Sequence, residues 1–197
     1  MMIDIGGEVA DKAADEPAQA QYCLFDTAIG PCGVAWAAHG LRRLQLPERD
    51  RTATAKRLGA RAAAAREIPT EIDRLIADIQ SYMNGRRTDF SAITLDLTGI
   101  DVFEQQVFAA ARRIPWGETT SYGELAQQIG APQAARAVGR ALARNPVPII
   151  VPCHRILAKG HRVGGFSAYG GAFTKQHLLA LEGVRVEAGT PLFPGFS

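Results

Sequence analysis

The sequence predicts an α/β (α+β) protein, with a small domain of strands and helices followed by a mostly helical domain. Short apolar runs broken by turn residues fill the beginning of the chain, and helical patterns dominate its second half. A length of 197 residues allows one large or two small domains. We therefore expect a disordered acidic tail at residues 1–21, an α/β domain at 22–98 and a second domain at 99–197.

The first domain is expected to begin with strands and to continue with helices. Residues 22–46 hold short apolar runs around a Gly-Pro turn, which favours strands. Residues 52–66 are rich in Ala, Arg and Leu, which favours a helix. Residues 71–83 carry an apolar stripe at helical spacing that ends before Asn84-Gly85. Residues 93–97 alternate like one more strand.

The second domain begins with three predicted helices. A helix over 103–113 must end before Pro115. Ser121 and Glu124 fit a capping box for a short helix, and a third helix is expected from Pro132 to Arg144. Two helices joined by a tight Gly-containing turn predict a helix-turn-helix.

The end of the second domain holds an apolar run, a glycine-rich segment and a last helix. The run VPIIV stops abruptly at Pro-Cys-His-Arg, where the cysteine is Cys153. A glycine-rich segment at 163–171 precedes a last helix at about 174–182. The sequence contains no internal repeat.

Composition excludes several classes of protein. Hydrophobic residues make up 47% and charged residues 21% of the chain, which is typical of globular proteins. No stretch approaches the roughly 20 apolar residues of a membrane helix, and the N-terminus lacks the pattern of a signal peptide. We therefore expect a cytoplasmic protein with no membrane partner and with reduced thiols at Cys23, Cys32 and Cys153.

Basic residues gather in one segment. Residues 111–162 contain eight Lys or Arg and two Glu, a net charge of +6, whereas the rest of the chain has a net charge of −4. Such a segment is typical of a face that binds a polyanion. An ordinary solvated basic surface is equally compatible with charge alone.

The predicted helix that ends at Arg144 could bind nucleic acid. Arg136, Arg140 and Arg144 are four residues apart and share one face, while Ala135 and Gly139 are small enough for close approach to a groove. The alternative is a surface helix with exposed arginines.

Cys153 is a candidate nucleophile. It follows a proline at the end of an apolar run and precedes His154 and Arg155. The reactive form of cysteine is the thiolate, and a neighbouring imidazole can take the thiol proton directly or through a water. Glu182 on the last helix is a candidate to hold that imidazole. The alternative is a buried, inert cysteine.

Four segments of the second domain resemble a known family. SYGELAQQIG, AARAVGRALARNPVPIIVPCHR, GGFSAYGG and LLALEG are closely similar to the O6-alkylguanine-DNA alkyltransferases, also called methylated-DNA–protein-cysteine methyltransferases. The resemblance covers about residues 100–185 with specific motifs and extends more weakly through 22–97.

The resemblance implies a fold and an activity. The fold is a ribonuclease H-like first domain followed by a winged helix-turn-helix domain. The activity is DNA repair, in which O6-alkylguanine, and by extension O4-alkylthymine, is flipped out of duplex DNA. The alkyl group moves irreversibly to Cys153 in a single turnover. Alkylated double-stranded DNA is the expected partner, with no cofactor, no metal and no obligate protein partner, and the protein is expected to be a monomer.

The resemblance also implies roles for catalytic residues. Cys153 accepts the alkyl group, and His154 is its water-linked general base. Glu182 orients the imidazole, Asn145 helps to hold the active-site turn, and Tyr122 contacts the flipped base and the adjacent phosphate.

A second set of residues is expected at the DNA and around the base. Arg136 fills the gap that the extruded nucleotide leaves, and the helix that carries it enters the minor groove. The other expected DNA contacts are Tyr122, Ala135, Gly139, Arg140 and Arg144. The expected substrate pocket consists of Leu142, Pro148, Arg155, Ile156, Phe166 and Ser167.

This sequence departs from the pattern of the family at several positions. Ala168-Tyr169 is an insertion in the glycine-rich loop, which could change the pocket wall. Arg140 and Arg144 stand where relatives often have glycine, and we expect them to strengthen phosphate contact. Ala37 and Arg42 stand where some relatives hold zinc, so Cys23 and Cys32 are expected to pack beside a hairpin rather than to bind metal.

Three alternative functions make different predictions. A non-catalytic sensor of alkylated DNA would lack the cysteine at position 153. A helix-turn-helix regulator would carry Asn or Gln side chains that read bases, and only Gln133 qualifies. A cysteine hydrolase would need an oxyanion hole, which no motif here marks.

Overall fold

The computed structural model describes residues 20–59, 62–160 and 162–186. The tail expected at residues 1–21 lies outside these ranges except for its last two residues. Ala20 is buried and Gln21 begins the first strand, so folded structure starts slightly before the expected boundary.

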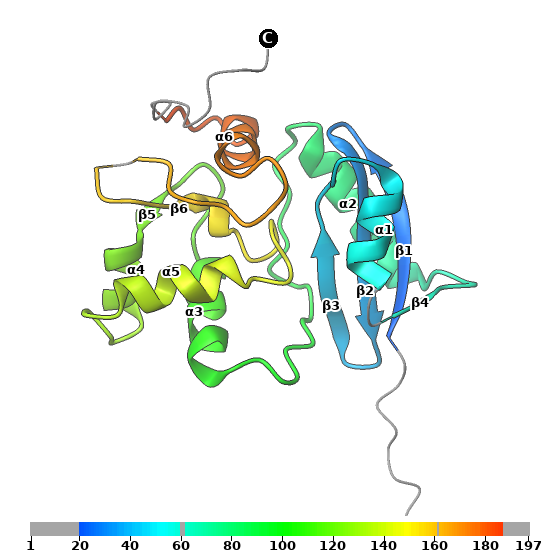
Figure 1. Cartoon of the computed structure of the whole chain (residues 1–197), viewed down its shortest axis with the longest axis horizontal. Coiled ribbons are helices and arrows are strands. Elements are labelled where there is room, and N and C mark those ends of the chain that lie inside the picture. The colour runs from blue at the N-terminus through cyan, green and yellow to red at the C-terminus, as the bar shows by residue number, and fades with distance from the viewer. Residues whose placement is uncertain (1–19, 60–61, 161, 187–197) are drawn as a thin grey trace, which may run out of the picture.

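A four-stranded sheet forms the centre of the first half (Figure 1). It comprises β1 (Gln21–Thr27), β2 (Gly30–Ala37), β3 (Gly40–Gln45) and β4 (Ala63–Ala64) in the order β3-β2-β1-β4. The first three strands are antiparallel, and β4 runs parallel to β1. The strands predicted for 22–46 are therefore confirmed. The turn into β3 needs a glycine, because Gly40 has a φ of +126° and a side chain there would approach Thr94 O within 2.6 Å.

Two helices accompany this sheet, α1 (Arg51–Gly59) and α2 (Thr70–Met83). The prediction for α2 is confirmed, including its end at Asn84 and Gly85, which has a φ of +75°. The helix predicted over 52–66 is wrong in its second half. Ala63 and Ala64 pair with β1 instead, so tertiary pairing overrides the local helical preference of the alanines.

The strand predicted at 93–97 is also wrong. Leu95 forms only an isolated bridge with Leu41 of β3. Farther along β3, the amide of Leu44 donates to Pro146 O at 3.0 Å, a carbonyl from the second half of the chain. The edge of β3 is therefore shared between two partners, and no continuous ladder forms.

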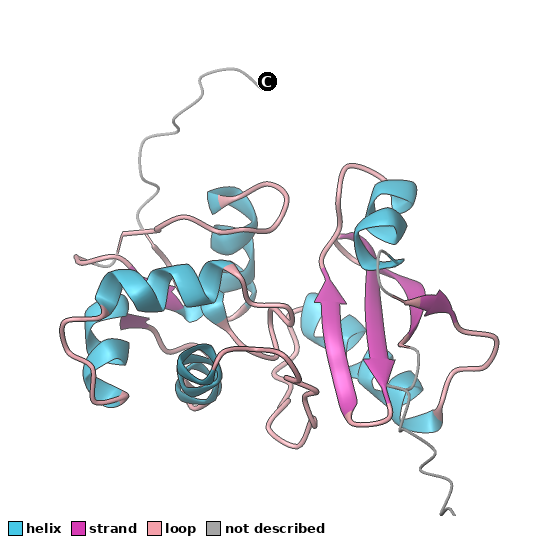
Figure 2. Cartoon of the chain, turned by 60° about the horizontal axis from the view of Figure 1, so that its bottom comes forward, coloured by secondary structure: helices cyan, strands magenta, loops and turns pink. Residues whose placement is uncertain are grey.

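Helices dominate the second half (Figure 2). They are α3 (Val102–Arg112), α4 (Tyr122–Gln128), α5 (Ala135–Ala143) and α6 (Ala172–Leu181). A short parallel pair, β5 (Thr120–Ser121) and β6 (Ile156–Leu157), and a 3₁₀ turn, η1 (Cys153–Arg155), complete it. The α+β class, a sheet domain followed by a helical domain, is confirmed.

Two details of the helix-turn-helix segment bear on the predictions. The capping box of α4 is present, with Glu124 N donating to Ser121 Oγ at 3.1 Å and Ser121 N donating to Glu124 Oε2 at 2.7 Å. The helix predicted from Pro132 starts later, at Ala135, because Ala134 N closes a turn on Ala131 O at 2.8 Å.

One hydrophobic core runs through both halves. It includes Phe25 and Ile79 from the first half and Val107, Val138 and Ile149 from the second. Burial of such side chains is the main stabilising contribution to the docking of the two halves. Among the described residues, no helix is long and apolar enough to cross a membrane.

Candidate active site

Asn145 closes the turn that presents Cys153. Its Nδ2 donates to Val151 O at 2.8 Å and to Cys153 Sγ at 3.2 Å, while its Oδ1 accepts from Val147 N at 3.0 Å. One side chain thus ties both ends of the turn and contacts the sulfur. This geometry agrees with the turn-holding position expected for Asn145.

The same turn holds a backbone conformation that is rare for its residue type. Ile149 has a φ of +73° and is buried. A β-branched residue in this region is a genuine outlier and persists only where its surroundings hold it there. The turn before Cys153 is therefore constrained by packing as well as by the hydrogen bonds of Asn145.

Cys153 lines a cavity of about 310 Å³. Cys153 itself is only 6% exposed. The cavity is lined by Tyr122, Gly139, Leu142, Ala143, Cys153, Gly165, Phe166 and Ser167. The structure therefore brings together the expected residues of α4 and α5 and of the glycine-rich loop around the candidate nucleophile.

A second cavity, of about 260 Å³, is lined by Cys153 together with residues of the first half. It is lined by Asn145, Pro148 and Ala168, and by residues of β3 such as Leu44. The inserted Ala168 thus contributes to a wall beside the sulfur, whereas Tyr169 is exposed. A larger cavity of about 850 Å³ lies on the first half, and no Cys or His is among the described residues that line it.

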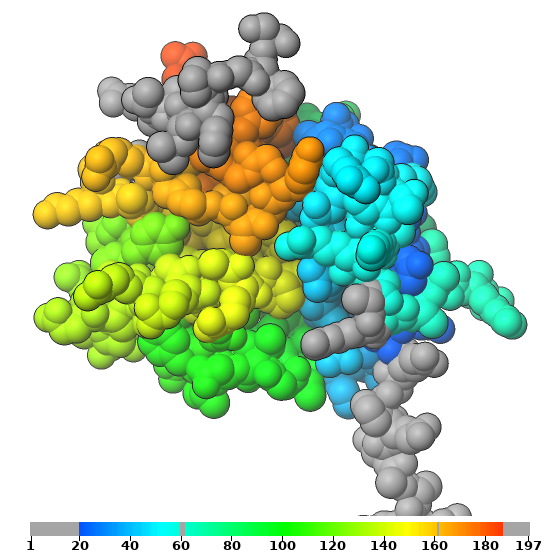
Figure 3. Space-filling view, viewed as in Figure 1, coloured from blue at the N-terminus to red at the C-terminus, as the bar shows by residue number. Residues whose placement is uncertain are grey.

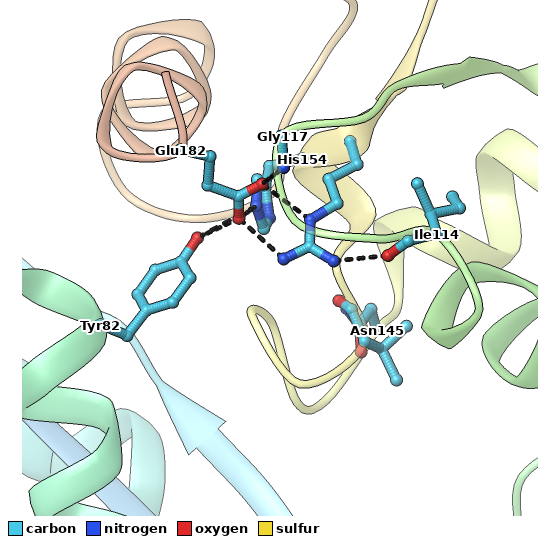
Figure 4. Close-up of polar contacts among 8 residues, drawn as sticks. Tyr82, Ile114, Gly117, Asn145, His154 and Glu182 are labelled. Atoms are coloured by element: carbon cyan, nitrogen blue, oxygen red, sulfur yellow. Dashed lines mark hydrogen bonds and ion pairs between the residues drawn. The ribbon is translucent and has the colours of Figure 1, made fainter. Parts of the chain in front are cut away.

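A buried carboxylate, Glu182, is the C-cap of α6 and lies beside His154 (Figure 4). Its Oε1 accepts from His154 Nε2 at 2.8 Å and from Arg155 Nη2 at 2.9 Å, and its Oε2 accepts from Arg155 Nε at 2.8 Å. Burial opposes ionisation of Glu182, but the hydrogen bonds from His154 and Arg155 outweigh it and lower its pKa to about 2. Glu182 is therefore a carboxylate that only accepts hydrogen bonds.

Both His154 and Cys153 are neutral at rest. Burial lowers the pKa of His154, and the contacts with Glu182 only partly offset this. Burial likewise raises the pKa of the Cys153 thiol, and the hydrogen bond from Asn145 and the charge of Lys175 only partly offset it. The sequence predicts a thiol made anionic by its imidazole neighbour. The structure instead indicates a thiol that must lose its proton during the reaction.

Lys175 is a charged group near the sulfur that the sequence analysis missed. It is fully buried on α6, its Nζ donates to Ile156 O at 2.5 Å, and it lies 5.7 Å from the centre of the Tyr122 ring. Burial lowers its pKa to about 8, so it is mostly cationic at neutral pH, and its charge favours the Cys153 thiolate. The feature of the sequence that could have identified Lys175 is a lysine on an otherwise apolar face of the last helix.

Two residues expected in the substrate pocket lie elsewhere. The guanidinium of Arg155 is bound by Glu182 and by Ile114 O at 2.6 Å. Ile156 is fully buried in β6. Neither is among the described residues that line the two cavities at Cys153. Both side chains face the interior, because Arg155 binds the buried Glu182 and Ile156 belongs to β6, which pairs with β5.

The arginines of α5 differ in their environments. Arg136 and Arg140 are exposed, and α5 crosses the face of the molecule seen in Figure 3. Arg144 forms an ion pair with Glu104 of α3. The prediction that Arg144 serves phosphate contact is therefore weakened, since part of its charge is already neutralised.

The ionisation of Glu182 makes stability depend on pH. Its folded pKa of about 2 lies below the ordinary value of 4.5, so its contribution is fully present above about pH 4.5 and is lost as pH falls through 2. We expect the free energy of unfolding, measured with urea from pH 6 to pH 2.5, to fall by about 3 kcal/mol or less. Glu182→Gln should remove most of this slope.

The matched control is Glu118→Gln, since Glu118 is an exposed glutamate. This variant should keep the acid slope of the wild-type protein. An unchanged slope in Glu182→Gln would show that another group controls acid unfolding.

The fold and the site define a class, a sheet domain followed by a helical domain that holds a candidate cysteine nucleophile next to a buried His–Glu pair. The family model for the 6-O-methylguanine DNA methyltransferase, DNA binding domain, matches residues 102–184. The methylated-DNA–protein-cysteine methyltransferase of Mycobacterium tuberculosis is 42% identical over 87% of this chain and 98% of its own length. That of Methanosarcina acetivorans is 34% identical over 82% of this chain and 97% of its own length.

Solved structures agree with the sequence relatives. The crystal structure of Mycobacterium tuberculosis OGT in complex with DNA has a TM-score of 0.67 and 38% identity, covering 82% of this chain and 92% of that one. The chain belongs to the methylated-DNA–protein-cysteine methyltransferase family.

Proposed function

We propose that this protein takes an alkyl group from O6 of a guanine in duplex DNA and keeps it on Cys153 Sγ. The observation that carries the proposal is the cavity beside α5, whose lining includes both Cys153 and Tyr122. An alkyl carbon on O6 of a stacked guanine lies in the major groove, out of reach of such a cavity. The base must therefore be extruded, which costs a few kcal/mol and less at a weakened pair.

The chemistry is a displacement at carbon that balances in one step. Cys153 loses its proton to Nδ1 of His154 through a bridging water. The sulfur then bonds to the alkyl carbon as the C–O6 bond breaks. Guanine leaves as the O6 anion and is reprotonated, so the thiol proton is finally carried by guanine. The thioether has no easy hydrolytic exit, so each molecule acts once.

Several side chains support these steps by their positions. His154 Nδ1 has no hydrogen-bond partner among the described residues, which leaves it open to accept a proton. Burial raises the pKa of Tyr122, so its hydroxyl remains protonated beside the cavity and can donate to the departing O6. Ser167 is a second donor in the same wall.

The face of α5 is the proposed surface for DNA. Arg136 at its beginning would fill the gap in the base stack, while Ala135 and Gly139 allow the helix to approach the minor groove. Arg140 would contact a phosphate. The proposed location is intracellular, where the thiol stays reduced.

The direct test of the proposal uses excess duplex containing one O6-methylguanine. We expect repaired guanine to reach a plateau at one equivalent per protein molecule, and an undamaged duplex to give no reaction. A parallel duplex with O4-methylthymine tests whether the cavity accepts the other lesion with an alkylated ring oxygen. Tight binding without any transfer would favour the alternative of a non-catalytic sensor.

The difference between Arg140 and Arg144 gives a separate prediction for DNA affinity. Arg140→Ala should weaken binding and reduce the slope of log affinity against log salt by about 0.9, the value for one lost phosphate contact. Arg144→Ala should reduce it less, because Arg144 is paired with Glu104. The measurement is a fluorescence anisotropy titration across salt concentrations.

Arg66→Ala is the control, since Arg66 is an exposed arginine between β4 and α2. Its salt slope should equal that of the wild-type protein. If a variant lacking both Arg140 and Arg144 keeps the wild-type slope, the proposed phosphate contacts are wrong.

A further inference from the structure

Tyr82 of the first half reaches into the Glu182 site. It lies at the end of α2, is 0% exposed, and packs edge-on against Trp116 with ring centres 5.2 Å apart. Its hydroxyl donates to Glu182 Oε1 at 2.6 Å and lies 3.1 Å from His154 Nε2. Figure 4 shows this side chain pointing from α2 toward Glu182 and His154. The fold thus brings a polar group of the first half into contact with the His154–Glu182 pair of the second.

The donors and acceptors around Tyr82 allow only one arrangement of protons. Burial and the neighbouring charge of Glu182 raise the pKa of Tyr82, so the hydroxyl keeps its single proton and gives it to the carboxylate. A lone pair of the hydroxyl then faces His154 Nε2, and Glu182 Oε1 faces the same nitrogen at 2.8 Å. Because Nε2 lies between these two acceptors, it must carry the proton of the neutral imidazole. Nδ1, which has no described partner, is therefore the bare nitrogen.

We propose that Tyr82 is a positioning residue for alkyl transfer, which holds Glu182 and the Nε2–H tautomer of His154 so that Nδ1 can take the thiol proton. The inference rests on the proposed function and adds a residue from outside the second domain to its machinery. It also gives the first domain a direct part in activating the thiol.

Tyr82 also influences the pKa of His154, because its hydrogen bond to Glu182 weakens the stabilisation of a protonated imidazole by that carboxylate. The groups that face His154 are Arg155 from η1, Tyr82 from α2, Lys175 from α6 and Glu182 at the C-cap of α6. Tyr82 stabilises the carboxylate charge by donating to it and stabilises the imidazole N–H by accepting from it. The bond to the charged carboxylate is the stronger of the two. Loss of the hydroxyl should therefore leave Glu182 more attractive to an imidazolium and raise the pKa of His154.

The first test is the single-turnover rate of methyl transfer from O6-methylguanine duplex as a function of pH in Tyr82→Phe. We expect the acid limb of the profile to move to higher pH. At neutral pH the rate constant should fall about 10-fold, a small part of the roughly 10²–10⁴-fold typical of general-base catalysis. DNA affinity should be unchanged, because Tyr82 is buried away from α5.

Phe90→Leu is the matched control. Phe90 packs on Tyr82 with ring centres 5.9 Å apart but has no polar group near Glu182. This variant should unfold at lower temperature and keep the wild-type acid limb. If Tyr82→Phe keeps both the rate and the acid limb of the wild-type protein, the inference is overturned. If the wild-type protein itself transfers no methyl, the proposed function has failed instead.

The second test needs no variant and so does not depend on Tyr82→Phe folding. Long-range ¹H–¹⁵N NMR spectra of the ¹⁵N-histidine-labelled wild-type protein report which imidazole nitrogen carries the proton. We expect His154 to be neutral at pH 7.5 with the proton on Nε2. A proton on Nδ1 would overturn the inference whatever the kinetics show.

Discussion

Replacing Cys153 with alanine is expected to abolish alkyl transfer while leaving DNA affinity within about two-fold of wild type. The sulfur forms the new bond to the alkyl carbon in the proposed reaction, so its removal leaves the alkyl group without an acceptor. Its side chain is small and nearly buried, with one hydrogen bond from Asn145, so its loss should disturb the fold little. The measurement combines methyl transfer to protein with anisotropy titration of O6-methylguanine duplex.

Cys23→Ala is the matched control for this result. Cys23 is a half-buried free cysteine on β1 and is not among the described residues that line the cavity at Cys153. It should transfer one methyl group per molecule at the wild-type rate. Residual transfer in Cys153→Ala would mean that a different side chain accepts the alkyl group.

Replacing His154 with alanine should give the second largest loss, about 10²–10⁴-fold in the single-turnover rate constant at neutral pH. Burial keeps the pKa of Cys153 above its ordinary value, so without a base the thiol is very rarely ionised. The rate should then rise with pH, because solvent hydroxide replaces the missing base. Rates across pH 6.5 to 9.5 measure this partial rescue.

His177→Ala provides the comparison for His154→Ala. His177 is an exposed histidine on α6, whereas Lys175 and Glu182 on either side of it in the sequence are buried. Its rate and its pH profile should match the wild-type protein. A His154→Ala variant with near wild-type rate at pH 7 would refute the assignment of the base.

The sequence was most informative where a residue type, its spacing and the chemistry agreed. The turn residues around β1 to β3, the stripe of α2 and the capping box of α4 each depend on local interactions, and the structure has all three. The resemblance to the family placed Cys153, His154 and Glu182 together, and the structure brings them to one site.

The errors have a common physical origin in long-range contacts. The helix predicted through residue 66 ends early because Ala63 and Ala64 pair with β1. The strand predicted at 93–97 does not form because Pro146 binds part of the same edge of β3. Arg155 was expected in the pocket, but a buried carboxylate 27 positions later binds its guanidinium. Local pattern carries no information about such partners.

Tyr82 and Lys175 were missed for a related reason. Tyr82 belongs to the apolar stripe of α2, and its hydroxyl takes part in the site only because it contacts Glu182, which is 100 positions away. Lys175 lies on a short helix where a single cation normally faces water. Both side chains are fully buried in the structure, and both contact groups within the proposed machinery.

The most direct measurement is mass spectrometry of the protein after reaction with excess O6-methylguanine duplex. The intact protein should gain one methyl group and no more, and peptide mapping should place it on the sulfur of Cys153. An unmodified Cys153 accompanied by repaired DNA, or repair of many lesions by each protein molecule, would contradict it.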